Sequence, residues 1–237
     1  MTWRLLIFSS VTAAALLPAA TVKGRVVLRD SREHAVRAQS DFSGVVIWLE
    51  PPAPLALPRN QRAKMLQKDK TFIPHVLAVT VGTMVDLPNL DPIFHNAFSN
   101  YDGQLFDLGL YPPRSSKGVR FTRPGLVRVF CNIHSTMSAV IAVMDTPYFA
   151  VTKENGRFEI ANVPEGTYGF RIFHERATDE TLARLNRQIN VTEDPEVDLG
   201  EIVISETGYL AIPHNNKYGK AYTPAPDDGG VYPATRK

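Results

Sequence analysis

Residues 126–143 have the sequence LVRVFCNIHSTMSAVIAV, in which a short polar loop separates two runs rich in β-branched residues. Such runs predict two β-strands joined by the loop. Alternation along the first strand places Val127, Val129 and Cys131 on one face and Arg128 on the other. We therefore expect Cys131 to point into a hydrophobic core from the end of a strand.

The rest of the chain repeats this pattern of short hydrophobic runs and turns. An Asn155-Gly156 turn between alternating runs predicts a hairpin, and residues 179–188 fit one short helix. The 18 Pro and 15 Gly in 237 residues favour many short strands over long helices. We therefore predict an all-β fold. The other expected strands include residues 22–28, 44–49, 76–81, 84–87, 118–121 and 201–204.

The charge and the cysteine content exclude several classes of protein. The chain has 26 Lys and Arg against 24 Asp and Glu, a formal net charge of +2. It lacks the basic excess of a nucleic-acid-binding protein, so we expect no nucleic-acid partner. Its single cysteine, Cys131, rules out an intramolecular disulfide and also the two-cysteine copper centre of respiratory oxidases.

The start of the chain is typical of an export signal. Arg4 precedes an apolar run, and a small-residue cleavage region follows. The run is shorter than the roughly 20 residues that span a bilayer, so a cleaved signal peptide at residues 1–20 is favoured over a permanent anchor. We expect a mature chain that starts near Thr21, lies in the periplasm and has no membrane span.

Four side chains in two distant stretches form a candidate metal site. Cys131, His134 and Met137 lie in one loop, and His95 lies in a loop after a predicted strand. A lone Cys beside a valine-rich strand is usually a buried small hydrophobe. One thiolate, two imidazoles and a weak axial thioether, however, are the ligand set of a copper electron-transfer site, whereas zinc more often takes further Cys or His ligands. The sequence therefore predicts one copper ion.

Residues 71–146 resemble a cupredoxin. The segment VGTMVDLPNLDPIFHNAFS (81–99) resembles the strand, turn and first-His segment of that family. The segment CNIHSTM (131–137) has the amicyanin spacing of Cys, two residues, His, two residues and Met. The resemblance implies a Greek-key β-sandwich, and amicyanin's association with methylamine oxidation is a fact of that family.

The resemblance also implies a role for each site residue. His95, Cys131 and His134 would bind copper in a plane, with Met137 as the axial ligand. Asn96, directly after the first His, would tie the two ligand loops together and donate hydrogen bonds near the sulfur. The departure from amicyanin is the pair Ser135-Thr136, which stands where that protein has a Pro and a bulky aromatic residue. This departure concerns the rim of the site and the identity of the partner.

The sequences on either side resemble the two halves of a carboxypeptidase-regulatory-like, transthyretin-type β-sandwich. TVKGRVVLRD and GVVIWLE precede the copper segment, and FAVTKENGRFEIANVPEGTYGFRIFHE follows it. We therefore expect a second small β-sandwich into which the cupredoxin domain is inserted. The expected division is a sandwich at residues 22–50 and 147–207, a linker at 51–70, the cupredoxin domain at 71–146 and an irregular tail at 208–237.

Several other residues have simpler explanations. His75, at a strand start, fits a structural or exposed role better than that of an extra ligand. Asp91 and Asp107 have no nucleophile to pair with, so surface or turn positions are expected. Leu108 and Leu110 fit either an apolar docking patch near the copper or a loop packed on its own sheet.

These features predict a periplasmic blue-copper electron carrier rather than an enzyme. The expected partner is a redox protein such as a c-type cytochrome or a dehydrogenase. Two alternatives stay open: a copper storage or delivery protein, and a non-redox binding or structural β-sandwich with a vestigial copper site. Fold resemblance alone does not decide among them.

Overall fold

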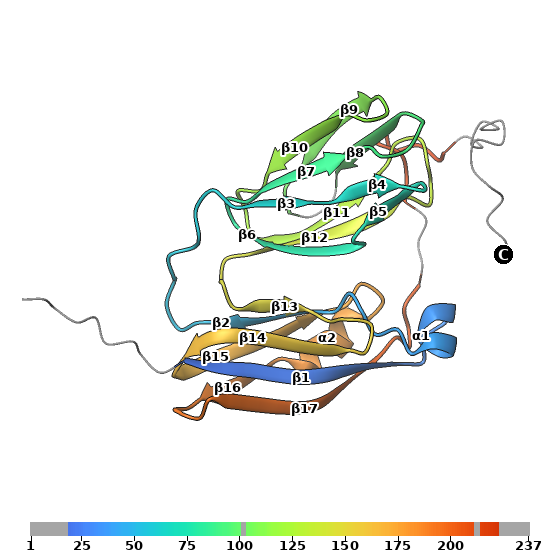
Figure 1. The fold of residues 1–237 in the computed structure, drawn as a ribbon. Helices are drawn as coiled ribbons and strands as arrows, with labels where there is room; N and C mark the ends of the chain where they lie inside the picture. The colour runs from blue at the N-terminus through green and yellow to red at the C-terminus, as the bar shows by residue number, and fades with distance from the viewer. Residues whose placement is uncertain (1–18, 101–102, 211–213, 223–237) are drawn as a thin grey trace, which may run out of the picture.

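The computed structural model describes residues 19–100, 103–210 and 214–222. As predicted, the fold is all-β, with two short helices in these residues, and its strands form two sandwiches that lie one above the other (Figure 1). The predicted signal peptide falls outside the described residues except for Ala19 and Ala20, which begin the first strand. Within the described ranges, no helix is long and apolar enough to cross a membrane.

The lower sandwich in Figure 1 combines sequence from both sides of the upper one. Its elements are β1 (Ala19–Arg29), α1 (His34–Gln39), β2 (Val46–Glu50), β13 (Phe149–Val151), β14 (Arg157–Pro164), β15 (Gly166–Phe173), α2 (Asp179–Leu185), β16 (Arg187–Val191) and β17 (Glu196–Ser205). One sheet has the order β14-β1-β17, in which β1 runs parallel to β17, and the other has the order β13-β2-β15-β16. Alternating apolar residues such as Val22, Val26, Ile47 and Phe170 form the core between them.

The upper sandwich is built from one continuous stretch of sequence. Its strands are β3 (Arg62–Lys64), β4 (Leu66–Lys68), β5 (Thr71–Ile73), β6 (Val76–Thr80), β7 (Met84–Pro88), β8 (His95–Ser99), β9 (Phe106–Tyr111), β10 (Ser116–Arg120), β11 (Gly125–Phe130) and β12 (Ser138–Met144). A five-stranded sheet, β6-β12-β11-β8-β9, faces the three-stranded sheet β10-β7-β3, and β4 pairs with β5. Val85, Phe121, Val129 and Ile141 belong to the core of this sandwich.

A further apolar cluster joins the two sandwiches. Val140 and Ala142 of β12 pack with Val46 of β2, and all three are buried. At the edge of this contact, Nε2 of His75 lies 2.7 Å from Oε1 of Glu175, and this hydrogen bond raises the pKa of His75. Apolar burial together with an ion pair favours a fixed arrangement of the two sandwiches.

Strands form where the sequence predicts a linker. Residues 62–68, inside the expected linker at 51–70, form β3 and β4 of the upper sandwich. The reason is that Met65 and Gln67 are fully buried, although the exposed residues around them are mostly basic or polar. The sequence prediction also omits α1, β5, β8, β9 and β16, whose hydrophobic runs are short or interrupted.

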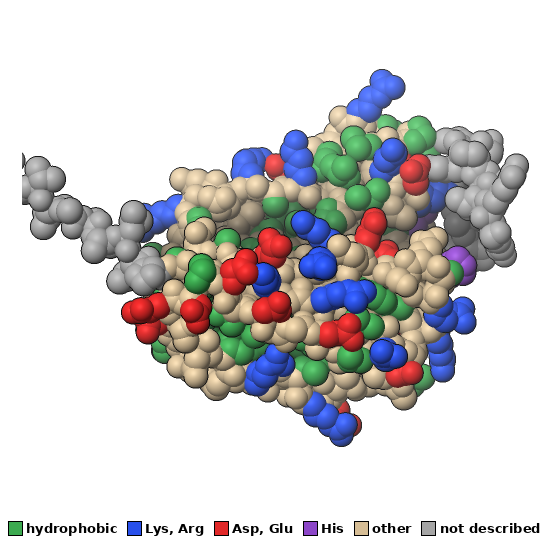
Figure 2. All heavy atoms as spheres, turned by 60° about the horizontal axis from the view of Figure 1, so that its bottom comes forward, with side chains coloured by type: hydrophobic (Ala, Val, Ile, Leu, Met, Phe, Trp, Pro, Cys, Tyr) green, Lys and Arg blue, Asp and Glu red, His purple; other side chains and the backbone are tan. Residues whose placement is uncertain are grey.

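The outer face of the lower sandwich carries charges of both signs. Figure 2 shows Lys and Arg side chains interspersed with Asp and Glu on this side of the molecule. Two ion pairs join β1 to β17, one between Lys23 and Glu196 and one between Arg25 and Glu201. Exposed pairs of this kind add little stability. The charges of this face are therefore mixed in sign.

A buried carboxylate directly after β17 makes the lower sandwich sensitive to acid. Glu206 accepts hydrogen bonds from Oγ of Ser31 at 2.6 Å, Nε2 of His174 at 2.8 Å and Nε of Arg176 at 3.1 Å. Burial raises the pKa of Glu206, but these hydrogen bonds outweigh burial and lower the pKa from 4.5 to about 2. The stabilisation is therefore present above pH 4.5 and is lost as the pH falls towards 2.

We predict that Glu206→Gln lowers the free energy of unfolding at neutral pH by at most about 3 kcal/mol. The same variant should flatten the fall of that free energy between pH 4.5 and 2. Urea unfolding at several pH values measures both effects. Glu201→Gln, in an exposed pair with Arg25, is the matched control and should change the free energy by less than about 1 kcal/mol. Equal acid sensitivity of the wild type and Glu206→Gln would contradict the prediction.

Candidate metal centre

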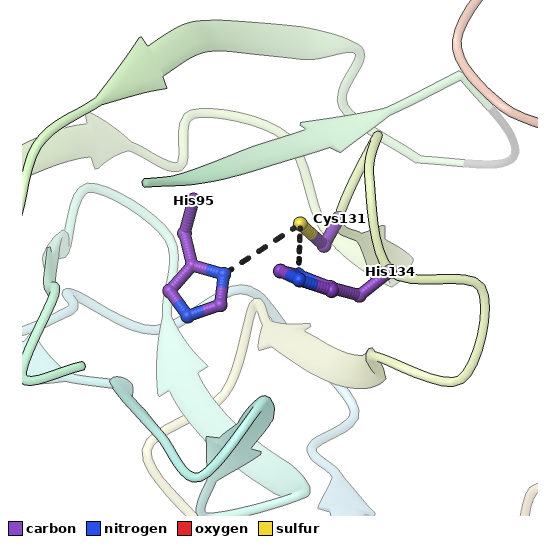
Figure 3. Close-up of side chains that lie close together, drawn as sticks. All are labelled: His95, Cys131 and His134. Carbon is purple, nitrogen blue, oxygen red and sulfur yellow. Dashed lines mark hydrogen bonds between the residues drawn. The ribbon is translucent and has the colours of Figure 1, made fainter. Parts of the chain in front are cut away.

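Three of the predicted ligands converge at one end of the upper sandwich. Sγ of Cys131 lies 3.6 Å from Nδ1 of His134 and 3.9 Å from Nδ1 of His95, as the dashed lines in Figure 3 mark. The three donor atoms lie within 4.8 Å of one another. A metal ion bound at about 2.3 Å from sulfur and about 2.0 Å from nitrogen, with trigonal or tetrahedral angles, needs sulfur–nitrogen distances of about 3.5–3.7 Å. The three donor atoms are therefore close enough together to hold a metal ion.

Two strands and one loop position these side chains. His95 is the first residue of β8, which pairs with β11 in the five-stranded sheet. Cys131 directly follows β11, and its backbone N–H donates to the carbonyl of Met137 at 3.0 Å. This hydrogen bond closes the loop just before β12, which pairs with β11 in antiparallel fashion. The closed loop places His134 beside the sulfur.

The sulfur of Cys131 is buried and surrounded by backbone donors. Burial raises the pKa of the thiol, and hydrogen bonds from the backbone N–H groups of Ile133, Asn96 and His134 oppose this increase in part. A buried thiol without charged neighbours keeps its proton at neutral pH. When a metal ion replaces that proton, the same N–H groups are placed to stabilise the negative charge on the sulfur.

Both imidazoles are neutral at neutral pH. Burial, together with the neighbouring His95, lowers the pKa of His134 to about 4. Burial also lowers the pKa of His95, although a hydrogen bond with Asp91 opposes it. The two ring centroids are 4.9 Å apart, with an angle of 65° between the ring planes. Because metal ions bind the neutral form of imidazole, both rings are ready to act as ligands.

Asp91 determines which nitrogen of His95 faces the sulfur. Oδ2 of Asp91 lies 2.6 Å from Nε2 of His95, so Nε2 carries the proton and Nδ1 keeps its lone pair. The carboxylate also accepts hydrogen bonds from the backbone N–H groups of Asp69 at 2.7 Å and Lys70 at 3.0 Å. These two residues have positive φ angles of 53° and 56° and form the turn between β4 and β5. This turn therefore supports the metal centre.

Sequence reasoning missed the role of Asp91, whose side chain is only 2% exposed and does not lie at the surface. One local signal was present, because Asp91 donates its backbone N–H to Oδ1 of Asn89 at 3.0 Å in a short Asx turn. Its position four residues before His95 is a second signal. The turn between β4 and β5 that completes the arrangement is distant in sequence, and no local pattern indicates it.

The other two predicted site residues lie beside the three ligands. Met137 is fully buried in the same apolar cluster as Cys131. Asn96 directs its backbone N–H to the sulfur, while its side-chain amide donates to Oδ1 of Asp107 in β9 at 2.9 Å. The contact of Asn96 with the cysteine thus comes from the backbone and not from the side chain.

Three further residues lie in the upper sandwich or against it without belonging to the predicted ligand set. Leu108 packs against the upper core, whereas Leu110 is 56% exposed, so only Leu110 has its side chain largely at the surface. The ring of His214 stacks on Phe130, with the centroids 4.0 Å apart. No sequence pattern connects His214 with the site, because the two stretches are far apart in the chain.

Comparisons with known proteins find partial structural likenesses. No protein-family model and no curated protein matches the chain. A Cu-containing nitrite reductase from Thermus scotoductus SA-01 is 24% identical over 39% of this chain and 25% of its own, with a TM-score of 0.35. The chain thus spans about a quarter of that enzyme's length.

Two smaller solved structures are covered almost completely. A purple cupredoxin from Nitrosopumilus maritimus is 21% identical over 35% of this chain and 99% of its own, with a TM-score of 0.32. An amicyanin variant in its Cu(I) form is 16% identical over 41% of this chain and 98% of its own, with a TM-score of 0.34. At such low TM-scores, the likeness assigns no function to this chain.

We predict that Asp91→Asn destabilises the metal-free protein by about 1–3 kcal/mol. The amide replaces one accepting oxygen with a donor, which then faces an N–H group that it cannot bind. Urea unfolding measures the loss, and nitrogen NMR measures the share of His95 with its proton on Nε2, which should fall. Asp86→Asn, which disrupts the surface pair with Arg62, is the matched control. Unchanged stability and an unchanged tautomer would show that Asp91 does not orient the ring.

Proposed function

We propose that this chain is a type 1 copper protein that transfers electrons, with His95, Cys131, His134 and Met137 as ligands. The convergence of one thiol sulfur and two neutral Nδ1 donors, at sulfur–nitrogen distances of 3.6 and 3.9 Å, carries the proposal. Soft sulfur and imidazole nitrogen suit copper. The buried Met137, in the same cluster as the cysteine, supports the assignment of a weak axial thioether.

The protein's part in electron transfer is to keep the ligands fixed and dry. When bound, copper takes up and releases one electron as it alternates between Cu(II) and Cu(I). Asp91 holds the ring of His95, and the backbone hydrogen bond from Cys131 to Met137 holds the loop. Since His95 and Cys131 are fully buried and His134 is only 8% exposed, the ligands offer little room for a substrate. We therefore assign electron transfer and no enzymatic reaction.

His134 is the proposed exit for electrons. It is 8% exposed, whereas the other two donors of the site are fully buried. Its ring edge is therefore the shortest path from the site to a docked redox protein, such as a c-type cytochrome or a dehydrogenase. With a net charge of only +2, docking would depend on contact surfaces more than on long-range steering. The apolar start of the sequence supports export to the periplasm through a signal peptide at residues 1–20.

The lower sandwich is proposed to be a separate carboxypeptidase-regulatory-like domain at residues 22–50 and 147–207. Its apolar cluster draws on residues from both of these stretches, while the cluster around the metal centre draws on residues between them. Two cores with a short apolar contact are what an inserted domain produces. The copper domain would then begin earlier than residue 71, since β3 and β4 belong to its fold.

Burial of the ligands favours a carrier over a storage or delivery protein. We predict that the copper-loaded protein retains its Cu(I) in the presence of a chelator while it completes many redox cycles. The physical reason is that the donors are at most 8% exposed, so the loop must open before copper leaves. Complete transfer of Cu(I) to the chelator within a single redox cycle would favour delivery instead.

We predict that one equivalent of Cu(II) gives the metal-free protein an intense blue absorption band and an EPR spectrum with narrow copper hyperfine splitting. Both features arise from a short bond between Cu(II) and a thiolate. Cys131→Ser should remove the band. His34→Ala removes an exposed histidine outside the site and should keep it, which makes this variant the matched control. A colourless wild type, or a blue Cys131→Ser variant, would overturn the proposed function.

A further inference from the structure

The described part of the C-terminal segment, residues 214–222, lies against the metal loop. It follows β17 of the lower sandwich in the chain, and Figure 1 draws these residues beside the upper sandwich. Oη of Tyr222 donates to the backbone carbonyl of Cys131 at 2.7 Å. The segment is therefore hydrogen-bonded directly to the residue that supplies the sulfur ligand.

Contacts between aromatic rings strengthen this interaction. The ring of His214 lies on Phe130, which directly precedes the cysteine ligand, with centroids 4.0 Å apart. Tyr222 meets His214 edge-on at a centroid distance of 5.2 Å, and its Oη lies 3.2 Å from Nδ1 of His214. Ring stacking adds dispersion and quadrupole attraction to the hydrogen bond. The segment thus contacts both the end of β11 and the first residue of the loop.

Lys217 connects the segment to both ligand-bearing stretches. Its backbone N–H donates to Oδ1 of Asn132, the residue after the cysteine, at 3.0 Å. Its ammonium group lies 2.7 Å from Oδ2 of Asp107. The other oxygen of Asp107 accepts a hydrogen bond from Asn96, the residue after the first histidine ligand. Lys217 therefore links the cysteine loop to the start of β8: its N–H group binds Asn132, and its ammonium group binds Asp107, which in turn binds Asn96.

The segment has a shape of its own. Oδ1 of Asn216 accepts hydrogen bonds from the backbone N–H groups of Tyr218 at 3.0 Å and Lys220 at 3.1 Å. The backbone N–H of Asn216 donates to the carbonyl of Lys220 at 2.8 Å. A turn closed by its own hydrogen bonds loses less conformational entropy when it docks.

We propose that residues 214–222 form a positioning strap that holds the loop of Cys131 and His134 closed, with Tyr222 and Lys217 as its positioning residues. The purpose of the strap rests on the proposed copper function. A loop that stays closed keeps the distances among the ligands constant and slows the exit of copper. The strap follows the lower sandwich in the chain. The lower sandwich, which supplies none of the proposed metal ligands, therefore anchors the metal loop.

Alkylation of the metal-free protein tests the strap without copper. Cys131 is the only cysteine and is fully buried, so iodoacetamide reaches it only when the loop opens. Tyr222→Phe removes the hydroxyl, with its contacts to the carbonyl of Cys131 and to Nδ1 of His214, and keeps the ring; it should raise the alkylation rate about 3- to 10-fold. Tyr168→Phe removes a hydrogen bond of the same kind, from Oη to the carbonyl of Pro164 in the lower sandwich at 3.0 Å, and is the matched control that should leave the rate unchanged. Equal rates for Tyr222→Phe and the wild type overturn the proposal.

Copper-loaded protein provides a second measurement. Tyr222→Phe should keep the blue band and release Cu(I) to a chelator faster than the wild type by a similar factor. Lys217→Met, which removes the ion pair with Asp107, should act in the same direction. A wild type without a blue band, together with faster alkylation of Tyr222→Phe, overturns the copper function and supports the strap. A blue Tyr222→Phe variant with the alkylation and copper-release rates of the wild type overturns the strap alone.

Discussion

The position of His95 relative to Cys131 depends on the pairing of two strands. Strands β8 and β11 pair at one position, where Phe98 lies opposite Phe130. This pairing brings His95 to the sulfur of Cys131 across 36 residues of sequence. The two phenylalanine rings have their centroids 5.9 Å apart, so the pairing gains side-chain contact as well as a backbone ladder. The site is therefore assembled by the formation of the sheet.

The local part of this arrangement is readable from the sequence, and the approach of His95 to Cys131 follows from the resemblance to a cupredoxin, but the supporting long-range contacts are not readable. The alternation that predicts an inward Cys131 is confirmed, since Val127 and Val129 are fully buried on the same side. The turn that supports Asp91 lies 22 residues earlier, and the contact of Tyr222 with the cysteine carbonyl spans 91 residues. Periodicity describes only neighbours in the chain, so no local pattern could predict either contact.

The strands within residues 51–70, where the sequence predicts a linker, have a related cause. Prolines and basic residues dominate the composition of this stretch, yet the buried Met65 and Gln67 decide its structure. Gln67 is polar, but its amide donates to the carbonyl of Leu87 at 3.3 Å and to Oη of Tyr111. The amide nitrogen thus finds acceptors inside the core, which lowers the cost of burying it. The composition of a segment therefore reflects mainly its exposed residues, whereas its few buried residues determine its fold.

Burial makes the site compatible with folding in the absence of metal. Desolvation lowers the pKa of His134 and raises that of the Cys131 thiol, so these donors enter the core without charge and do not repel one another.

Neutral donors alone would leave the loop free to rearrange, and the orientation of the donors has to come from contacts outside the ligands. Asp91 supplies it for His95, and the strap supplies it for the cysteine loop. The strap follows the lower sandwich in the chain, after residues 206–209, where the backbone N–H of Tyr209 donates to the carbonyl of Glu206. Because it is tethered there, it docks as an intramolecular segment at high effective concentration. A sandwich without ligands of its own thus contributes to the rigidity of the metal centre.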